Sequence, residues 1–350
     1  MDIFLEFEKP IAALEKRLQD LRDLASQEGV DLSNEIRILE KKCEKLTQET
    51  FSRLSPWQKV QLSRHPSRPH ARDYIDAVFP DFMELKGDRL FGDDQAIIGG
   101  IATWPTPGGD QQKKQSVVVL GHQKGRTTKL KLERNFGMAR PEGYRKAMRL
   151  MDLAQRFQLP LISLIDTPGA FPGLEAEARG QSQAIAESIE KLFELTIPTA
   201  AVIIGEGGSG GALALGVADL VLMQEYSVYS VISPESCASI LWSDSSLAER
   251  AANKLKMSAG ELFEMKVIDA IIPEPKGASH RNVSEAAQFV KQALIDQFQP
   301  IMSGYFTKQK NPKTQKLQEN HDAQKLGLRE SRFEKFRKLG NFAITHLETN

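Results

Sequence analysis

The first fifty residues alternate apolar and polar positions with the period of a helix. The apolar positions recur three and four residues apart at Phe4, Phe7, Ile11, Leu14, Leu18 and Leu21 and, after a polar break, at Ile36, Leu39, Cys43 and Leu46. The break contains Gly29, and Ser33 has the side chain of a helix N-cap. The pattern predicts a helical hairpin over residues 1–54. We interpret this hairpin as a packing or subunit-contact arm, because such spacing reports packing.

From about residue 95 onward, short apolar runs alternate with helical stripes. The expected strands are residues 97–103, 116–120, 161–165, 199–204 and 220–223. The two stripes carry apolar residues at Ala147, Leu150, Met151, Ala154 and Phe157, and at Ile185, Ile189, Leu192 and Phe193. All-apolar strands that alternate with helices indicate an α/β domain with a largely buried sheet, which we place at residues 55–300.

Two segments next to this pattern contain structure-breaking or polar residues. Residues 55–70 hold three prolines and predict an irregular connector. Residues 301–350 predict a polar link followed by a C-terminal helix. Within them, residues 307–325 are rich in glutamine and lysine, which predicts a flexible link. The short basic helix is expected near residues 328–340.

Composition excludes several classes of protein. The 350 residues are 41% hydrophobic and 26% charged, with a net charge of zero, so no global electrostatic argument favours nucleic acid or a membrane. The two cysteines form no C-x-x-C pair and the six histidines are scattered, so we expect neither a disulfide framework nor a metal site. The N-terminus lacks a signal-peptide pattern, and no apolar run approaches the roughly 20 residues that span a bilayer. We therefore expect a soluble, cytoplasmic protein.

The stretch "IGEGGSGGALA" (204–214) matches three different templates. As G-x-G-x-x-G with Glu225 further on, it resembles a dinucleotide fingerprint, although only about nine residues separate it from the next strand. As G-x-S-x-G, it would make Ser209 a nucleophile, with Asp269 and His280 as candidate partners.

The third template needs no reactive side chain. Glycines at a strand-to-helix turn can present backbone N–H groups to a developing negative charge. Gly207 and Gly208 suit this role, because a Cβ there could block close approach. Glycine used only for tight packing remains an alternative.

Two further segments predict the walls of a binding site. "DTPGAFPG" (166–173) follows a strand, and Asp166 could act as a base or cap a helix. Residues 124–149 hold nine Lys or Arg against two Glu. This surplus either steers an anionic substrate such as a coenzyme A thioester or forms a solvated face. Few aromatic residues are interleaved, so we expect no nucleic-acid surface.

Eight motifs in order resemble the carboxyltransferase alpha subunits of bacterial and plastid multi-subunit acetyl-CoA carboxylases, from about residue 3 to 340. They are "SPWQKVQLSRHPSRP", "LKGDRLFGDD", "GHQKGR", "NFGMARPEGYRKAMRLM", "IDTPGAFPG", "RGQSQAIA", "IGEGGSGGALALGVAD" and "YSVYSVISPESCASILW". The chain departs from that pattern at Ser236 and Glu175, where the family has glycine, at Phe171, where it has tyrosine, and in the insertion "PGGDQQKKQ" (107–115).

The resemblance implies a crotonase-like fold of repeated ββα units. It implies an enzyme that moves the carboxyl group of carboxybiotin to acetyl-CoA, giving malonyl-CoA, the first committed step of fatty-acid biosynthesis. The implied partners are a zinc-bearing beta subunit in an α₂β₂ complex, a biotin carboxyl carrier protein that brings the biotin, and biotin carboxylase. No biotin-attachment motif is present in this chain, and we expect no metal in it. Two alternatives stay open. One is a self-sufficient acyl-CoA carboxyltransferase or decarboxylase of the same fold, and the other is a non-catalytic interaction subunit, which the helical arm and the basic C-terminus would suit.

By motif match, the resemblance assigns the stabilisation of the biotin ureido oxyanion to the backbone N–H groups of Gly207 and Gly208. Gly169 and Ala170 are implied to line the substrate site, and Lys124 and Arg126 are candidates to contact substrate.

Overall fold

The structure is a computed structural model that describes residues 3–105, 115–310 and 327–340. Its α-helices are α1 (Lys9–Glu28), α2 (Ser33–Phe51), α3 (Pro56–Ser63), α4 (Ala71–Val78), α5 (Thr128–Glu133), α6 (Pro141–Phe157), α7 (Leu174–Ala178), α8 (Gln181–Glu194), α9 (Ser209–Gly216), α10 (Pro234–Trp242), α11 (Ala248–Leu255), α12 (Ala259–Glu264), α13 (Val283–Ala293), α14 (Gln299–Lys310) and α16 (Leu328–Arg337). Its shorter helical turns are η1 (Glu6–Glu8), η3 (Asn135–Gly137), η4 (Ser245–Leu247) and the π-helical η5 (Leu294–Phe298).

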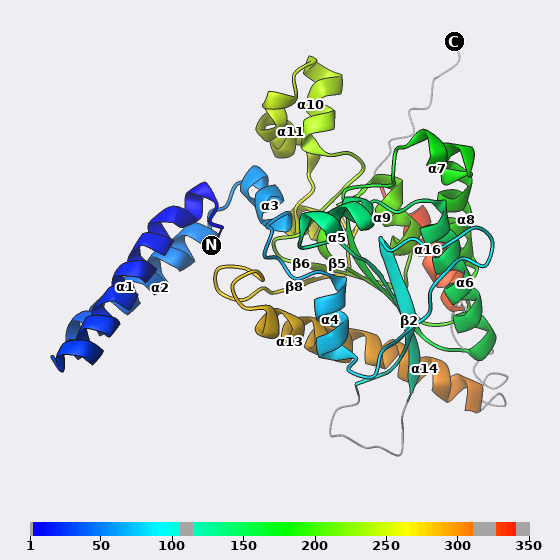
Figure 1. The fold of residues 1–350 in the computed structure, drawn as a ribbon. Coiled ribbons are helices and arrows are strands. Elements are labelled where there is room, and N and C mark those ends of the chain that lie inside the picture. The colour runs from blue at the N-terminus through cyan, green and yellow to red at the C-terminus, as the bar shows by residue number, and fades with distance from the viewer. Residues whose placement is uncertain (1–2, 106–114, 311–326, 341–350) are drawn as a thin grey trace, which may run out of the picture.

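A mixed sheet lies at the centre of the fold (Figure 1). Its strands are β1 (Met83–Glu84), β2 (Ile97–Thr103), β3 (Ser116–His122), β4 (Leu161–Thr167), β5 (Thr199–Gly208), β6 (Leu220–Gln224), β7 (Val228–Ser230) and β8 (Ala270–Ile272). The order is β1-β2-β3-β4-β5-β6-β8, with β7 paired to the end of β5. The β1–β2 and β2–β3 pairs are antiparallel, and the pairs from β3 to β8 are parallel. The five predicted strands are confirmed.

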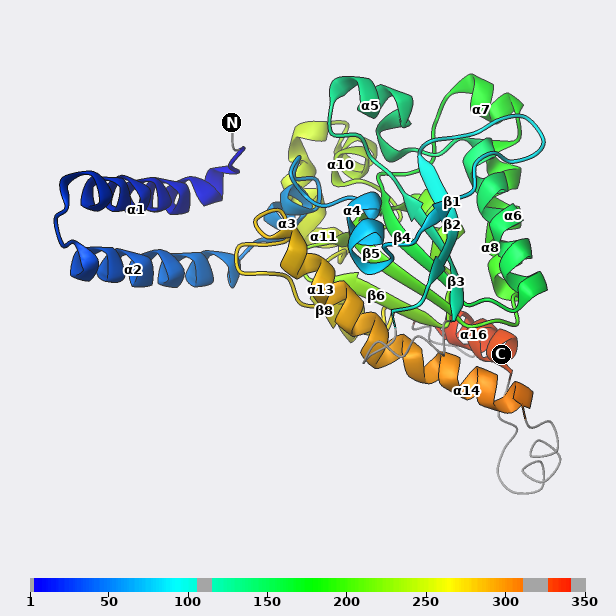
Figure 2. The ribbon, with the colours of Figure 1, turned by 60° about the horizontal axis from the view of Figure 1, so that its bottom comes forward.

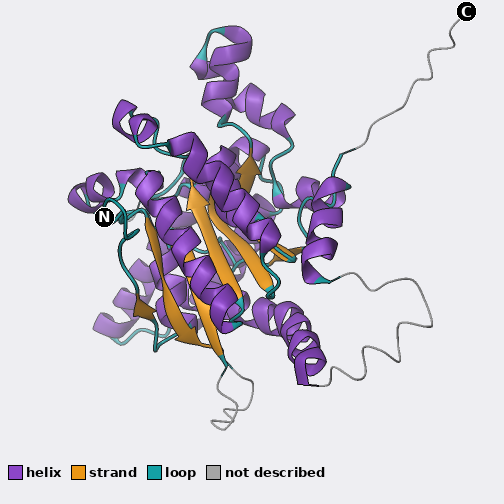
Figure 3. Cartoon of the chain, turned by 90° about the vertical axis from the view of Figure 1, so that its right-hand side faces the viewer, coloured by secondary structure: helices purple, strands orange, loops and turns teal. Residues whose placement is uncertain are grey.

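Helices cover both faces of the sheet, as Figures 2 and 3 show. On β3, Val118 and Leu120 pack toward α6 and α8, whereas Val117 and Val119 pack toward α4 and α13. This alternation follows from the two-residue period of a strand, and the apolar side chains on both faces explain why the strand reads as a continuous apolar run. Phe157 was expected in the α6 core stripe, but it is 61% exposed at the end of that helix.

The predicted N-terminal hairpin is present and projects from the body (Figure 1). Helix α1 ends at Gly29, whose φ of 65° is the left-handed conformation that glycine adopts at a helix end. Ser33 does not cap α2 as predicted. It is the first helical residue, and the Asp31 carboxylate accepts its N–H at 3.1 Å.

The prediction of an irregular connector at 55–70 is wrong in its first half, which forms α3. Pro56 occupies the first turn of the helix, where its missing N–H costs nothing. Ser55 and Gln58 form a capping box: the Ser55 hydroxyl accepts the Gln58 N–H at 3.2 Å, and Gln58 accepts the Ser55 N–H at 2.8 Å.

The predicted C-terminal helix is α16, and a buried arginine fixes it to the sheet. Arg332 is 0% exposed and donates to both carboxylate oxygens of Asp219 at 3.0 and 2.8 Å. It also donates to the carbonyls of Leu192, Leu195 and Ile197. Of the segment predicted to be a flexible link, residues 307–310 end α14 and residues 311–325 lie outside the described chain. The boundaries at residues 54 and 300 stay predictions.

Within the described ranges, no helix combines the length and the apolar character that crossing a membrane requires.

Candidate functional site

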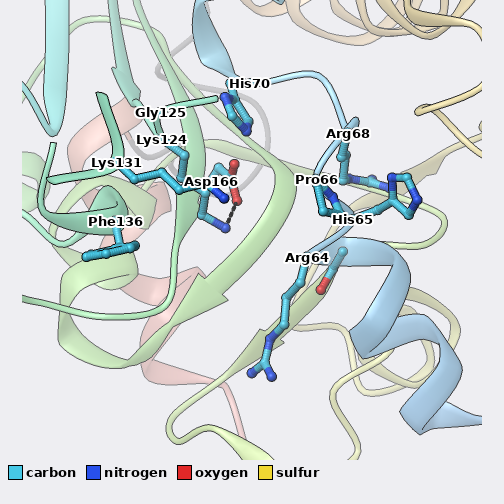
Figure 4. Close-up of a pocket in the computed structure, with 11 residues that line it drawn as sticks. Arg64, His65, Pro66, Arg68, His70, Lys124, Gly125, Lys131, Phe136 and Asp166 are labelled. Carbon is cyan, nitrogen blue, oxygen red and sulfur yellow. Dashed lines mark ion pairs between the residues drawn. The ribbon is translucent and has the colours of Figure 1, made fainter. Parts of the chain in front are cut away.

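A cavity of about 150 Å³ opens where β3 and β4 end. Lys124 and Gly125, just beyond β3, and Asp166, near the end of β4, form one wall. The segment from Ser63 to His70, between α3 and α4, forms the opposite wall, and Lys131 and Phe136 close the side (Figure 4). The carboxyl ends of parallel strands are where α/β sheets bind ligands, so this cavity lies in the expected part of the fold.

Charged side chains from distant parts of the chain meet beside this cavity. The Lys124 ammonium lies 2.8 Å from Asp166 Oδ1 and 2.7 Å from Glu206 Oε2. Arg64 binds the other oxygen of Glu206 at 2.6 Å and contacts Glu235 on α10 at 2.5 Å. These ion pairs connect α3, β4, β5 and α10 to Lys124, the second residue after β3.

The surroundings of Lys124 and Glu206 keep both side chains charged. Burial alone would lower the pKa of the Lys124 ammonium, but Asp166 and Glu206 together raise it. Burial alone would raise the pKa of the Glu206 carboxyl, but Lys124 and Arg64 together lower it. Burial, followed by the charge of Lys124, lowers the pKa of the nearby His122 to about 3, so that its imidazole is neutral near pH 7. Burial likewise lowers the pKa of His70, which lines the cavity.

The glycine stretch forms the predicted turn between a strand and a helix. Gly207 and Gly208 are the last residues of β5, and Gly208 is the N-cap of α9. Ser209, the next residue, is exposed and has a φ of 54°, an uncommon conformation for a residue with a Cβ. The turn therefore stands at the positive end of a two-turn helix, as the oxyanion interpretation requires.

Close packing explains why these positions are glycine. A Cβ on Gly208 would lie 2.1 Å from the Pro168 carbonyl oxygen, and one on Gly207 would lie 2.6 Å from the Tyr229 ring. A Cβ on Gly211 would lie 2.6 Å from the Ala170 nitrogen. The turn therefore packs against the segment that carries Gly169 and Ala170, which the resemblance also placed at the site.

The structure brings the predicted site residues together only in part. Gly208 and Gly169 are neighbours, because a Cβ on Gly208 would lie 3.0 Å from the Gly169 nitrogen. Of the six residues that the resemblance placed at the site, only Lys124 lines the cavity, together with Asp166, the candidate base. Arg126 points elsewhere and pairs with Asp73 at 2.5 Å. Whether any of them touches substrate stays a prediction.

The serine-nucleophile interpretation is wrong, because its partners lie in other contacts. Asp269 accepts the Val221 N–H at 2.6 Å and pairs with Lys335. His280 pairs with Glu8 at 2.9 Å.

His280 belongs to the one group of potential metal ligands found in the described part of the chain, with Glu8 and His65, whose ligand atoms lie within 4.8 Å of one another. His65 Nε2 already contacts the Ile3 carbonyl at 2.9 Å, and the two imidazole rings stack 3.9 Å apart. The Arg281 guanidinium lies 3.5 Å from Glu8 and opposes a further cation. These contacts fit the docking of the N-terminal residues onto the domain. The expectation that this chain holds no metal stays a prediction.

The basic stretch is largely neutralised by neighbouring carboxylates. Six of its nine basic residues lie within 4.0 Å of a carboxylate: Lys124, Arg126, Lys129, Arg140, Arg145 and Lys146. Three of the family departures, Phe171, Glu175 and Ser236, do not line the cavity, and residues 107–114 of the insertion lie outside the described chain. Glu175 pairs with Arg140 at 3.1 Å, and Ser236 hydrogen-bonds to Ser233.

Sequence reasoning did not find Arg64, Glu206 or His70 as parts of this site. Arg64 and His70 belong to the resembling motif "SPWQKVQLSRHPSRP" or follow it directly, and Glu206 stands within the glycine stretch. Their positions in the motifs were the only signal available, because their partners are far away in the sequence.

Comparison with known proteins agrees with these observations. A family model described as acetyl co-enzyme A carboxylase carboxyltransferase-like matches residues 4–321. A relative from Thermus thermophilus, named acetyl-coenzyme A carboxylase carboxyl transferase subunit alpha, is 49% identical over 97% of this chain and 99% of its own. A relative of the same name from Methylococcus capsulatus is 54% identical over 84% of this chain and 89% of its own.

Solved structures with a similar fold are more distant. A chain of transcarboxylase 12S, with methylmalonyl-coenzyme A and methylmalonic acid bound, has a TM-score of 0.49 at 19% identity. The match covers 63% of this chain and 42% of that one. A chain of a Pseudomonas malonate decarboxylase hetero-tetramer in complex with coenzyme A has a TM-score of 0.49 at 16% identity and covers 64% and 86%. The sheet with helices on both faces and the N-terminal hairpin confirm the predicted α/β class with a helical hairpin. That this α/β domain is crotonase-like stays what the resemblance implies.

Proposed function

Because the chain belongs to the acetyl co-enzyme A carboxylase carboxyltransferase family, we propose that it is the alpha subunit of the carboxyltransferase component of acetyl-CoA carboxylase. In that role it takes part in moving a carboxyl group from carboxybiotin to acetyl-CoA, which gives malonyl-CoA. The observation that carries the proposal is the match to relatives of this name over nearly the whole chain.

The transfer makes demands that the glycine turn can meet. The bond between the carboxyl carbon and the ureido nitrogen breaks, and a carbon–carbon bond forms to the acetyl methyl group, whose proton ends on that nitrogen. Negative charge develops on the ureido oxygen and on the thioester oxygen during these steps. Each preorganised N–H donor aimed at such a charge lowers the barrier by about 2.7–4 kcal/mol.

We assign the ureido oxygen to the backbone N–H groups of Gly207 and Gly208. Their place at the end of β5 and at the start of α9 supports the assignment. The contact between Gly208 and Pro168 supports it further, because it holds the turn rigidly against the loop after β4. No side-chain nucleophile is needed, since the ureido nitrogen itself accepts the methyl proton.

The site that stabilises the thioester oxygen is assigned to a separate beta subunit in an α₂β₂ complex. The biotin is assigned to a carrier protein, on which biotin carboxylase carboxylates it. Exposed apolar side chains on α5, α7 and α10 support a partner surface. They are Leu132 (62% exposed), Leu174 (85%), Ile240 (73%) and Leu241 (61%). These three helices lie along one side of the molecule in Figure 2. Large exposed apolar side chains of this kind mark protein contacts when they gather on one side.

The reverse reaction tests the function directly. Malonyl-CoA and a free biotin derivative would be incubated with this chain, with its cognate beta chain, and with both, and the acetyl-CoA formed would be measured. We expect activity only in the mixture. Activity of this chain alone would instead indicate a self-sufficient acyl-CoA carboxyltransferase or decarboxylase, and silence of the mixture would indicate a non-catalytic interaction subunit.

A further inference from the structure

The ladder between β4 and β5 is interrupted just before the glycine turn. Ile165 pairs with Ile203, but Thr167 pairs with Gly207, so a single residue of β4 stands opposite three residues of β5. At the same point β5 changes its other neighbour from β6, which it pairs up to Ile203, to β7, which it pairs from Glu206 onward. Such bulges redirect a strand and often lie beside active sites.

Side chains replace the ladder contacts that the bulge removes. Asp166, the lone β4 residue, accepts the Glu206 N–H at 3.0 Å through Oδ1. The same oxygen receives the Lys124 ammonium at 2.8 Å, and this ammonium also donates to Glu206 Oε2 at 2.7 Å. Lys124 therefore bridges the carboxylates of Asp166 and Glu206 and so joins the end of β4 to the bulge of β5.

The Lys124 ammonium balances the negative charges of the two carboxylates in this contact. The side chains of Asp166 and Glu206 are 3% and 10% exposed, so two carboxylates would repel each other in a poorly solvated place without a cation between them. Arg64 holds Glu206 from the far side and does not contact Asp166 in the described ion pairs. The Asp166 carboxylate also packs closely on the backbone of the bulge, because a Cβ on Gly205 would lie 2.4 Å from Asp166 Oδ1.

We propose that Lys124 is a positioning residue, which fixes the bulge at Glu206 and thereby the direction in which Gly207 and Gly208 present their backbone N–H groups. It does so through Asp166 and Glu206 and not by contact with substrate. This inference rests on the proposed function for its effect on rate, but its effect on the bulge does not depend on any activity.

Lys124→Met in the complex with the beta chain tests the inference, and Lys146→Met is its matched control. Lys146 is also a buried lysine in an ion pair, 0% exposed and 2.6 Å from Asp93, but it lies on α6 and takes no part in the bulge. We expect Lys124→Met to lower kcat of the reverse reaction by roughly tenfold or more, since small misplacement of reacting groups is costly. The KM for malonyl-CoA should stay within about twofold, because its oxyanion site is assigned to the beta subunit. Lys146→Met should keep kcat.

Hydrogen exchange of the peptides that cover residues 199–216 gives a second readout, which needs no activity. Exchange should become faster in Lys124→Met and stay at the wild-type rate in Lys146→Met, because only in the former does Asp166, the acceptor of the Glu206 N–H, lose the cation that holds it in place. If Lys124→Met fails to fold, Asp166→Leu keeps roughly the size of the side chain but removes the oxygen that accepts from both Glu206 and Lys124, and it should show a loss of kcat and faster exchange as well.

Equal kcat in the two lysine variants would overturn the positioning role while leaving the proposed function intact. Unchanged exchange at residues 199–216 in Lys124→Met would overturn it as well. An inactive wild-type complex would overturn the proposed function, and the exchange experiment would then decide alone whether Lys124 fixes the bulge.

Discussion

Gly208→Ala places a methyl group where the turn between β5 and α9 has no room for one. The new Cβ would lie 2.1 Å from the Pro168 carbonyl oxygen and 2.4 Å from its carbon. Ordinary contact begins near 3.4 Å, so the turn and the loop after β4 must separate by roughly 1 Å. A misplacement of about 1 Å can cost ~10²-fold in rate, and a lost oxyanion donor costs ~10²–10³ in kcat. We therefore expect kcat to fall by about two orders of magnitude.

The assay is the reverse reaction of the complex with the beta chain, with kcat expressed per folded complex. Gly100→Ala is the matched control, because its Cβ would lie 2.0 Å from the Met83 carbonyl oxygen, the same kind of backbone clash. That clash lies between β1 and β2, and β3 and β4 separate it from β5. Both variants should lose about 1–3 kcal/mol of stability from overpacking, but only Gly208→Ala should lose rate.

Gly210→Ala completes the set, because its Cβ would meet only Ile185 Cγ2, at 3.4 Å. This variant should keep both stability and rate. The reasoning would be refuted if Gly208→Ala kept the wild-type kcat, which would remove the glycine turn from the mechanism. It would equally be refuted if Gly100→Ala lost as much rate as Gly208→Ala, since the loss would then reflect general destabilisation.

Two further predictions concern buried charges. Arg332→Met should weaken the docking of α16 by about 3–5 kcal/mol, because it leaves Asp219 buried without its partner. Limited proteolysis should then cut near this helix, whereas Arg337→Met, at a side chain that is 70% exposed, should leave the digestion pattern unchanged. Burial alone would raise the pKa of Glu274, but Arg68 lowers it below its ordinary value of 4.5. The ionised Glu274 therefore stabilises the folded protein above pH 4.5, and this stabilisation is lost as the pH falls through the lower pKa that Glu274 has in the folded state. Urea unfolding across pH should therefore show that Glu274→Gln is less stable than wild type at neutral pH but loses less stability between neutral and acidic pH; parallel curves would contradict this.

The apolar pattern located the strands but not their ends. Predicted strands that stopped at 120, 165 and 204 continue to His122, Thr167 and Gly208. The residues that extend these strands are mostly glycine, aspartate and glutamate, which are uncommon in strands. The apolar pattern alone therefore does not extend a strand through them. These strands are extended instead by pairing with their neighbours in the middle of the sheet, as where Thr167 of β4 pairs with Gly207 of β5. The candidate site residues Gly207 and Gly208 thus stand where the sequence signal ends.

Helix α3 was missed for a different reason. The expectation of an irregular connector rests on the three prolines of residues 55–70, but only Pro56 lies in the helix, at a position that tolerates proline. The capping box of Ser55 and Gln58 was present in the sequence as S-x-x-Q and would have indicated a helix start.

Net charge along a segment says little about the field that the folded chain produces. The surplus in residues 124–149 suggested steering of an anionic substrate, yet the fold supplies carboxylates from far away, and the partner Glu206 of Lys124 is 82 residues distant in the sequence. Lys131, Arg134 and Arg149 are the members of the stretch without a carboxylate within 4.0 Å among the described residues. Only Lys131 of these three lines the cavity. The charge of the stretch therefore acts mainly by joining elements of the fold, as Lys124 does at the bulge. Among the basic residues of the stretch, only Lys131 lines the cavity without a carboxylate partner among the described residues.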